Sequence, residues 1–185
     1  MRTNQWALPA LGLFLLAAGT GCAAKQAAGR TDSGEPDNAV RAAIINTKGK
    51  TIGSALLTPE KEGVRIRLEV KGLAPGPHGY HIHETGRCEA PGFTTAGAHF
   101  NPGGKKHGLQ NPEGPHAGDL PNLNVASDGT AKADWIADGV TLTKGEPNSL
   151  LKEGGTSIVI HEAPDDGVTD PSGNSGARVA CGIIS

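Results

Sequence analysis

This chain of 185 residues has few aromatic residues, little sulfur and almost no net charge. Aromatic residues make up 3% of it, so a hydrophobic core must rest on valine, isoleucine, leucine and alanine. A disulfide or a bound ion would therefore add more to the stability than usual. The formal charge of −2 lacks the basic excess that nucleic acid or an anionic membrane surface attracts, so neither is an expected partner.

The apolar run near the N-terminus is too short to span a bilayer comfortably. It begins at Ala7, follows the single charge of Arg2, and ends in small residues before Cys22. A positive end, an apolar middle and a small-residue region are typical of an export signal, which we predict over residues 1–21. The alternative, a buried helix of the fold, is disfavoured because the polar stretch that follows would isolate it.

Cys22 directly follows the sequence GTG and resembles the lipidated cysteine of bacterial lipoproteins. Cys88 and Cys181 can pair, which leaves Cys22 as an odd thiol in an exported chain. Lipidation would explain this thiol, with ordinary signal cleavage as the alternative. We therefore expect a lipid anchor at Cys22.

The rest of the chain divides into a tether and one domain. Residues 22–38 are small and polar, without periodicity, and are expected to form a flexible tether. Residues 39–185 have the length of a single domain. The expected location is outside the cytoplasm, in the periplasm or cell envelope, with the lipid as the only membrane contact.

Alternating apolar and polar residues recur along the domain, in short segments bounded by glycine, proline and asparagine. The segments are 39–47, 51–58, 63–70, 78–84, 130–138, 156–163 and 177–185. None has the 3.6-residue apolar stripe of a helix, and the 28 glycines and 13 prolines favour many turns. We therefore predict an all-β fold, a Greek-key sandwich or barrel of about eight antiparallel strands.

Two long segments lack a strand pattern. One lies between residues 84 and 130, and the other lies between His161 and Arg178. Loops this long in compact domains are usually functional or disordered. The first carries three histidines and an aspartate, which favours function.

Three of the seven histidines fall in HGYHIH, residues 78–83. Alternate residues of a strand face the same side, so His81 and His83 project together and can share one metal ion. An exposed polar face is the alternative for this pair. His78 faces the other side with Tyr80, and we predict a buried histidine that bonds backbone groups and is not a ligand.

The segment that follows offers three imidazoles and one carboxylate within 21 residues: His99, His107, His116 and Asp119. Together they form the closed tetrahedral set that structural zinc takes, although each alone would most often be a polar surface residue. Nearby glycines and prolines let the segment fold tightly around an ion. His161 ends the apolar segment TSIVIH and is either a capping or core histidine or a further ligand.

Six motifs resemble those of the copper- and zinc-containing superoxide dismutases: GYHIHE, GAHFNP, KHG, HAGDLPNL, IVIHEAPDD and GNSGARVACGII. GRCEAP and GDLPNL are most similar to the exported bacterial branch. The resemblance covers nearly all of 39–184. It implies that superoxide is converted to dioxygen and hydrogen peroxide by a redox-cycling copper next to a structural zinc, one of each per chain. It leaves a homodimer open.

The resemblance also implies a role for individual residues. Copper is expected on His81, His83, His99 and His161, and zinc on His99, His107, His116 and Asp119, with His99 shared. Asp165 is expected to link a copper histidine to a zinc histidine. Arg178 is expected to attract and position the anion, and His99 to deliver a proton. Cys88 and Cys181 fall where the family has its disulfide.

One departure from the family lies in residues 162–177, which carry four carboxylates and no lysine where the family commonly places lysine to guide superoxide. Lys105 and Lys106 are candidates to replace it. The alternative function is a non-catalytic copper/zinc-binding module that buffers metal, which the retention of Arg178 and of every copper histidine disfavours. A zinc hydrolase is disfavoured because protein fills every zinc position.

Overall fold

The computed structural model describes residues 38–185; the predicted export signal, Cys22 and nearly all of the predicted tether lie outside the described residues. The described part is antiparallel β-structure with one short 3-10 helix, η1 (Thr94–Ala96), which confirms the all-β prediction. The strands are β1 (Val40–Asn46), β2 (Thr51–Glu60), β3 (Gly63–Lys71), β4 (Gly76–His78), β5 (Tyr80–His83), β6 (Leu123–Val125), β7 (Thr130–Ala137), β8 (Thr156–His161) and β9 (Arg178–Ile184). No helix in this part is long and apolar enough to cross a membrane.

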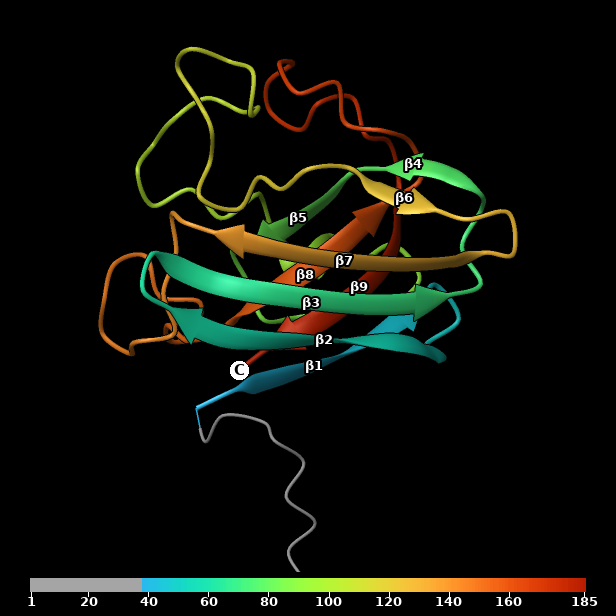
Figure 1. Cartoon of the computed structure of the whole chain (residues 1–185), viewed down its shortest axis with the longest axis horizontal. Helices are drawn as coiled ribbons and strands as arrows, with labels where there is room; N and C mark the ends of the chain where they lie inside the picture. Colours follow the sequence, from blue (N-terminus) through green and yellow to red (C-terminus); the bar gives the residue numbers. More distant parts are fainter. Residues whose placement is uncertain (1–37) are drawn as a thin grey trace, which may run out of the picture. The chain divides into compact units, whose positions relative to one another are not determined.

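Seven strands form one curled sheet in the order β5-β8-β9-β1-β2-β3-β7. Figure 1 shows β1, β2, β3 and β7 in one layer, with β5, β8 and β9 passing behind them. The pairing of β1 with β9, in which Ile44 lies opposite Gly182, joins the two layers. Neighbours that are not consecutive in the chain, such as β3 and β7, are the crossovers expected of a Greek key.

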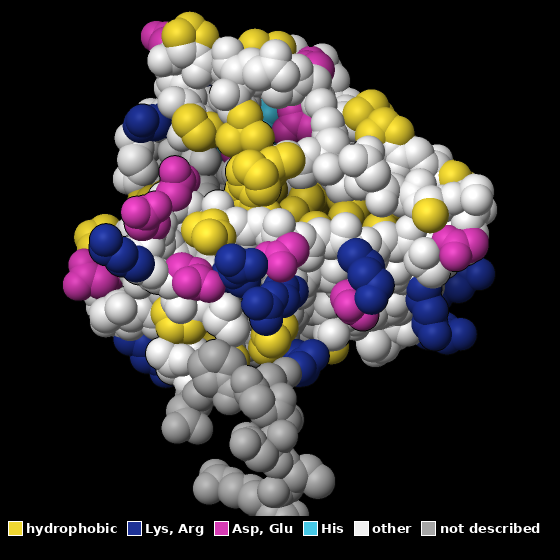
Figure 2. Space-filling model, viewed as in Figure 1, with side chains coloured by type: hydrophobic (Ala, Val, Ile, Leu, Met, Phe, Trp, Pro, Cys, Tyr) yellow, Lys and Arg dark blue, Asp and Glu magenta, His cyan; other side chains and the backbone are white. Residues whose placement is uncertain are grey.

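Strand β3 shows how the alternation in the sequence builds the core. Its apolar residues Val64, Ile66 and Leu68 are fully buried, and each contributes about 1.5–3 kcal/mol of hydrophobic stabilisation. The residues between them face solvent and form ion pairs, such as that of Arg65 with Asp134 at 2.9 Å. Figure 2 shows cationic and anionic side chains interspersed over this outer face. Exposed pairs of this kind add little stability, so the core carries most of it.

The strands missed by the sequence analysis are the two shortest. β4 and β6 have three residues each and pair with one another as a separate two-stranded sheet. Three residues are too few to establish an alternation, so β6 was hidden inside the segment 84–130. Each of the seven predicted segments overlaps one of the other seven strands, with ends that differ by up to two residues; segment 78–84 corresponds to β5, and its first residue, His78, belongs to β4.

Three long loops connect the strands, and the two that carry the predicted site residues are the first long loop, over residues 84–122, and the second long loop, over residues 162–177; the third joins β7 to β8 over residues 138–155. Figure 1 shows much of the first and second long loops at the end of the sandwich where β4 and β6 lie. A disulfide between Cys88 and Cys181 ties the start of the first loop to β9, as expected. With a sequence separation of 93 between the cysteines, it stabilises the fold by about 4–5 kcal/mol in the chain-entropy description.

Candidate metal centre

The first long loop folds back along β5 and pairs with it through backbone hydrogen bonds. The amide of Ile82 donates to the Gly118 carbonyl at 2.8 Å, and the Ile82 carbonyl accepts from the amide of Phe100 at 2.8 Å. Position 118 requires glycine, because a Cβ there would overlap the Ile82 carbonyl oxygen. This pairing sets His99 beside His83 and Asp119 beside His81.

His81, His83, His99 and His161 form one cluster, called the four-histidine group below. All four rings are buried, and their candidate ligand atoms lie within 4.8 Å of one another. One ring nitrogen of each is held by an acceptor. His83 Nδ1 donates to the Gly97 carbonyl at 3.0 Å, His161 Nδ1 donates to the Gly176 carbonyl at 3.2 Å, and His81 Nε2 donates to Asp165 at 2.7 Å. These acceptors place the ring proton on the nitrogen that faces away from the cluster.

The other nitrogen of each ring therefore presents a lone pair. His81 Nδ1, His83 Nε2, His99 Nε2 and His161 Nε2 are buried and have no hydrogen-bond partner in the described part of the chain. Buried polar atoms without partners are rare in folded proteins. Four converging imidazole lone pairs fit a copper ion, since imidazole is a good copper ligand.

His99, His107, His116 and Asp119 form a second cluster, called the Asp119 group below. Asp119 Oδ1 lies 3.0 Å from the Nδ1 atoms of His99 and His107 and 3.3 Å from that of His116. Adjacent ligands of a tetrahedral zinc ion, with bonds of about 2.0–2.1 Å, are about 3.3 Å apart. Asp119 Oδ2 is fixed by the amides of Gly108 and His116, both at 2.9 Å. The cluster therefore fits zinc without rearrangement of the backbone.

Burial dominates the electrostatics of the four-histidine group. It lowers the pKa of His83 to about 2, with a further contribution from His99. It lowers the pKa of His161 to about 3, helped by His81, and that of His99 to about 4 despite the nearby Asp119. These imidazoles are neutral near neutral pH, which is the form that binds metal.

The Asp119 group shows the opposite electrostatics. Burial would raise the pKa of Asp119, but hydrogen bonds from His107, His116 and His99 hold it well below its usual range. Burial would lower the pKa of His107, but Asp119 and Asp165 raise it to about 9. Zinc would take the place of the proton that His107 shares with Asp119, so zinc binding releases that proton.

Asp165, in the second long loop, joins the two groups. Its carboxylate accepts from His81 Nε2 at 2.7 Å and from His107 Nε2 at 3.1 Å. The sequence analysis did not assign a role to Asn122, which bonds the backbone of Asp165 twice, as donor and as acceptor, both at 2.8 Å. The position of Asn122 in the GDLPNL motif is the feature of the sequence that could have indicated its role. Gly173 lies so close to Asp165 and His107 that any side chain would displace them.

Arg178 lies beside the four-histidine group, at the start of β9. Its guanidinium donates to the carbonyls of Phe93 at 2.8 Å and Gly97 at 2.7 Å. The Gly97 carbonyl also accepts from His83, so the cation is fixed relative to a predicted copper ligand. These backbone carbonyls carry no signal in the sequence.

His78 is a structural residue, as predicted. It is buried, and its two ring nitrogens lie 2.6 Å from the His161 carbonyl and 2.8 Å from the Ala74 carbonyl. The position of His161 in the sequence left its role open, and the family resemblance placed it among the copper ligands. In the structure it presents its Nε2 to the four-histidine group.

Comparison with known proteins agrees with this geometry. A family model described as copper/zinc superoxide dismutase matches residues 51–184. Over 149 residues, the chain is 53% identical to the Cu-Zn superoxide dismutase 2 of Aquifex aeolicus, covering 80% of this chain and 87% of that protein. Over 139 residues, it is 47% identical to the Cu-Zn superoxide dismutase of Caulobacter vibrioides, covering 74% of this chain and 79% of that protein. The solved structure of a SOD-like protein from Bacillus subtilis matches with a TM-score of 0.76 at 42% identity, covering 78% of this chain and 97% of that protein.

Fold and site together define an antiparallel β-sandwich that carries two adjoining metal-binding groups with one histidine in common. The chain belongs to the copper/zinc superoxide dismutase family.

Proposed function

We propose that this chain dismutates superoxide, converting two superoxide anions and two protons to one dioxygen and one hydrogen peroxide. The observation that carries the proposal is the set of four buried, unpartnered ring nitrogens that adjoins the Asp119 group through His99. We assign copper to His81, His83, His99 and His161, and zinc to His99, His107, His116 and Asp119.

Bound copper would supply reversible one-electron chemistry, which zinc cannot. The chain's own residues do the rest. Arg178 offers a fixed positive charge that attracts the anion and orients it. His99 Nε2 can hold and release the proton that hydrogen peroxide requires, because its Nδ1 faces Asp119 at 3.0 Å and fixes the ring. Asp165 keeps His81 and His107 in the orientation that both groups need.

Metal analysis beside a superoxide-consumption assay tests this function. We expect about one copper and one zinc per chain, since there are two complete ligand sets that share a residue. The fully loaded protein should consume superoxide at a rate that copper removal abolishes. Full loading without superoxide consumption would instead identify a metal-buffering module.

We also propose that the chain is exported and held at the cell envelope by a lipid on Cys22. Its disulfide supports this location, because disulfides persist in oxidising compartments. Mass spectrometry of the protein from cells tests it. We expect an acylated Cys22 at the new N-terminus, and an unmodified N-terminus that begins beyond Cys22 would overturn the anchor. Association into a homodimer remains an expectation that sedimentation equilibrium tests.

A further inference from the structure

The second long loop lies against the segment of the first long loop that carries His107, a ligand that we assign to zinc. The amide of Gln110 donates to the Gly167 carbonyl at 3.0 Å. Gly108 is so close to the same carbonyl that a side chain at position 108 would overlap it. The position of His107 therefore depends on a contact between two segments that are distant in the sequence.

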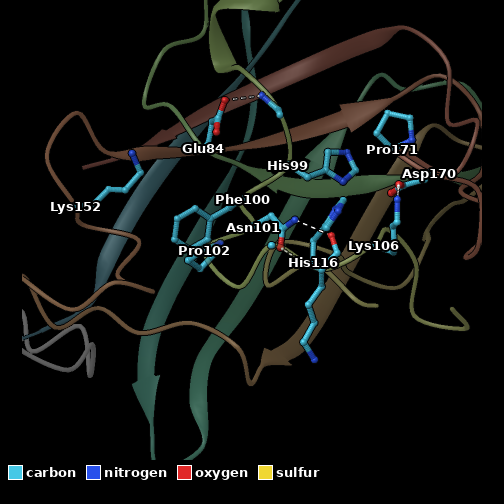
Figure 3. A pocket seen from close by; sticks show the side chains of 13 residues that line it. Glu84, His99, Phe100, Asn101, Pro102, Lys106, His116, Lys152, Asp170 and Pro171 are labelled. Atoms are coloured by element: carbon cyan, nitrogen blue, oxygen red, sulfur yellow. Dashed lines mark hydrogen bonds and ion pairs between the residues drawn. The ribbon is translucent and has the colours of Figure 1, made fainter. Parts of the chain in front are cut away.

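One carboxylate of the second long loop holds two consecutive residues of the first. Asp170 Oδ1 accepts from the backbone amide of His107 at 2.8 Å, and Asp170 Oδ2 accepts from Lys106 Nζ at 3.0 Å. Figure 3 shows the pair of Lys106 and Asp170 at the wall of a hollow of about 520 Å³, which His99 and His116 also line. Asp170 therefore connects the two loops beside the proposed zinc site.

All the polar groups of His107 have a partner. Its ring nitrogens lie 3.0 Å from Asp119 and 3.1 Å from Asp165. Its carbonyl accepts from the Asn111 side chain at 2.9 Å, and its amide donates to Asp170. Asp165 and Asp170 both belong to the second long loop, so this loop holds the ring and the backbone of the ligand.

The other members of the Asp119 group are held in a different way. The His116 amide donates to Asp119 Oδ2 at 2.9 Å, and the Asp119 amide donates to the His116 carbonyl at 3.2 Å, both within the first long loop. His99 lies beside His83 of β5 in a β-bridge. The first long loop and β5 therefore fix the backbone of these three ligands, whereas the second long loop fixes the backbone amide of His107.

We infer that Asp170 is a positioning residue that retains zinc by holding the backbone amide of His107. This inference rests on the zinc assignment of the proposed function. A zinc ion leaves when one of its ligands moves away, and His107 cannot move outward without breaking its bond to Asp170. A hydrogen bond to an ionised carboxylate is about twice as strong as one between neutral groups. The ion pair with Lys106 is exposed and adds little, so the bond to the amide carries the effect.

The experiment measures how fast the fully metallated protein gives up zinc and copper to an excess of a colorimetric chelator. Asp170→Ala removes the amide bond and the ion pair, and zinc release should become about tenfold faster or more. Asp170→Asn keeps a neutral acceptor for the amide and should be about threefold faster than the wild type. Lys106→Met removes the ion pair alone and should stay within about twofold. Copper release should change less than about twofold throughout, because His107 is not in the four-histidine group.

Asp166→Ala is the matched control. The Asp166 carboxylate accepts three hydrogen bonds, all from groups of the second long loop. Its loss loosens that loop but leaves the His107 amide bound to Asp170, so zinc release should stay within about twofold of the wild type. Equal acceleration in Asp166→Ala and Asp170→Ala would show that order in the loop alone retains zinc, and the inference would be wrong.

Two variants decide the question even if Asp170→Ala does not fold. Asp170→Asn and Lys106→Met both lose the ion pair, but only Asp170→Asn weakens the bond to the His107 amide, so it should release zinc faster. Equal zinc release from these two variants would overturn the inference, as would wild-type zinc release from a folded Asp170→Ala. A wild-type protein that binds copper but no zinc would instead refute the zinc assignment itself.

Discussion

The four-histidine group and the Asp119 group share His99 and yet are held in place by different forces. In the Asp119 group, one carboxylate oxygen lies within 3.3 Å of three imidazole nitrogens. In the four-histidine group, no carboxylate faces inward, and the rings are oriented from behind by Gly97, Gly176 and Asp165. The Asp119 group is organised by a carboxylate inside the cluster. The four-histidine group is organised by hydrogen-bond acceptors outside it.

This difference suits the two tasks. A group closed around its own carboxylate keeps a fixed tetrahedral geometry, which is what a structural ion needs. Four imidazoles without a carboxylate among them leave the charge at the centre to the ion itself and to Arg178. The net positive charge that remains attracts an anionic substrate. The same comparison gives four predictions.

Removal of Asp119 should have the largest effect. Asp119 is the main partner that raises the pKa of His107, and Asp119→Ala removes it. Breaking such a buried pair lowers the free energy of unfolding by about 3–5 kcal/mol. Zinc should be lost while copper is retained, as measured by elemental analysis and denaturant unfolding. His161→Gln is the reciprocal variant and should lose copper while keeping zinc. Full zinc in Asp119→Ala would contradict the assignment.

Asp165 couples the two groups, so its replacement should affect both metals. In Asp165→Asn an amide replaces the carboxylate that accepts from His81 and His107, and affinity for both ions should fall about 10–100-fold. Competition with a chelator of known affinity measures this. Asp166→Asn is the matched control, because the Asp166 carboxylate bonds only within the second long loop. Equal affinities in the two variants would remove the coupling role.

Arg178 distinguishes catalysis from metal storage. An arginine is not a metal ligand, so Arg178→Ile should leave both metal contents unchanged. Superoxide consumption should fall about tenfold or more, with weaker salt dependence, because the local positive potential is lost. Stopped-flow kinetics over a range of ionic strength measures this. Unchanged activity would show that Arg178 has no part in the reaction.

The metal-free protein should lose stability at both ends of the pH range, for different reasons. His83 and His161 have folded pKa values of about 2 and about 3, below the ordinary 6.5, so the unfolded state takes up protons first. Stability should fall as the pH drops below about 6.5, by about 1.4 kcal/mol per pH unit for each titrating histidine. The pKa of His107 is raised to about 9, so its contribution is complete below pH 6.5 and lost as the pH rises through 9.

Denaturant unfolding of the metal-free protein across the pH range separates the two effects. His161→Gln should reduce the acid slope by about 1.4 kcal/mol per pH unit and leave the alkaline slope unchanged. His107→Gln should instead reduce the alkaline slope and leave the acid slope unchanged. Identical profiles for both variants and the wild type would show that neither pKa shift contributes to stability.

The sequence predicted much of this protein for a physical reason. Alternation with a period of two marks strands with one buried face, and GVRIRLEV became β3 with Val64, Ile66 and Leu68 in the core. His81 and His83 lie on the same strand, so their common side follows from strand geometry alone. The short strands β4 and β6 could not be predicted, because three residues do not establish a period.

What the sequence by itself determined was therefore the β-class of the fold and the residues able to bind metal. Only the tertiary structure decided which atoms of those residues converge. The acceptors that orient the rings and fix Arg178 include the backbone carbonyls of Phe93, Gly97 and Gly176, and every residue carries such a carbonyl. Side-chain type is written in the chain, but the position of a backbone oxygen or a surface charge depends on contacts between distant segments.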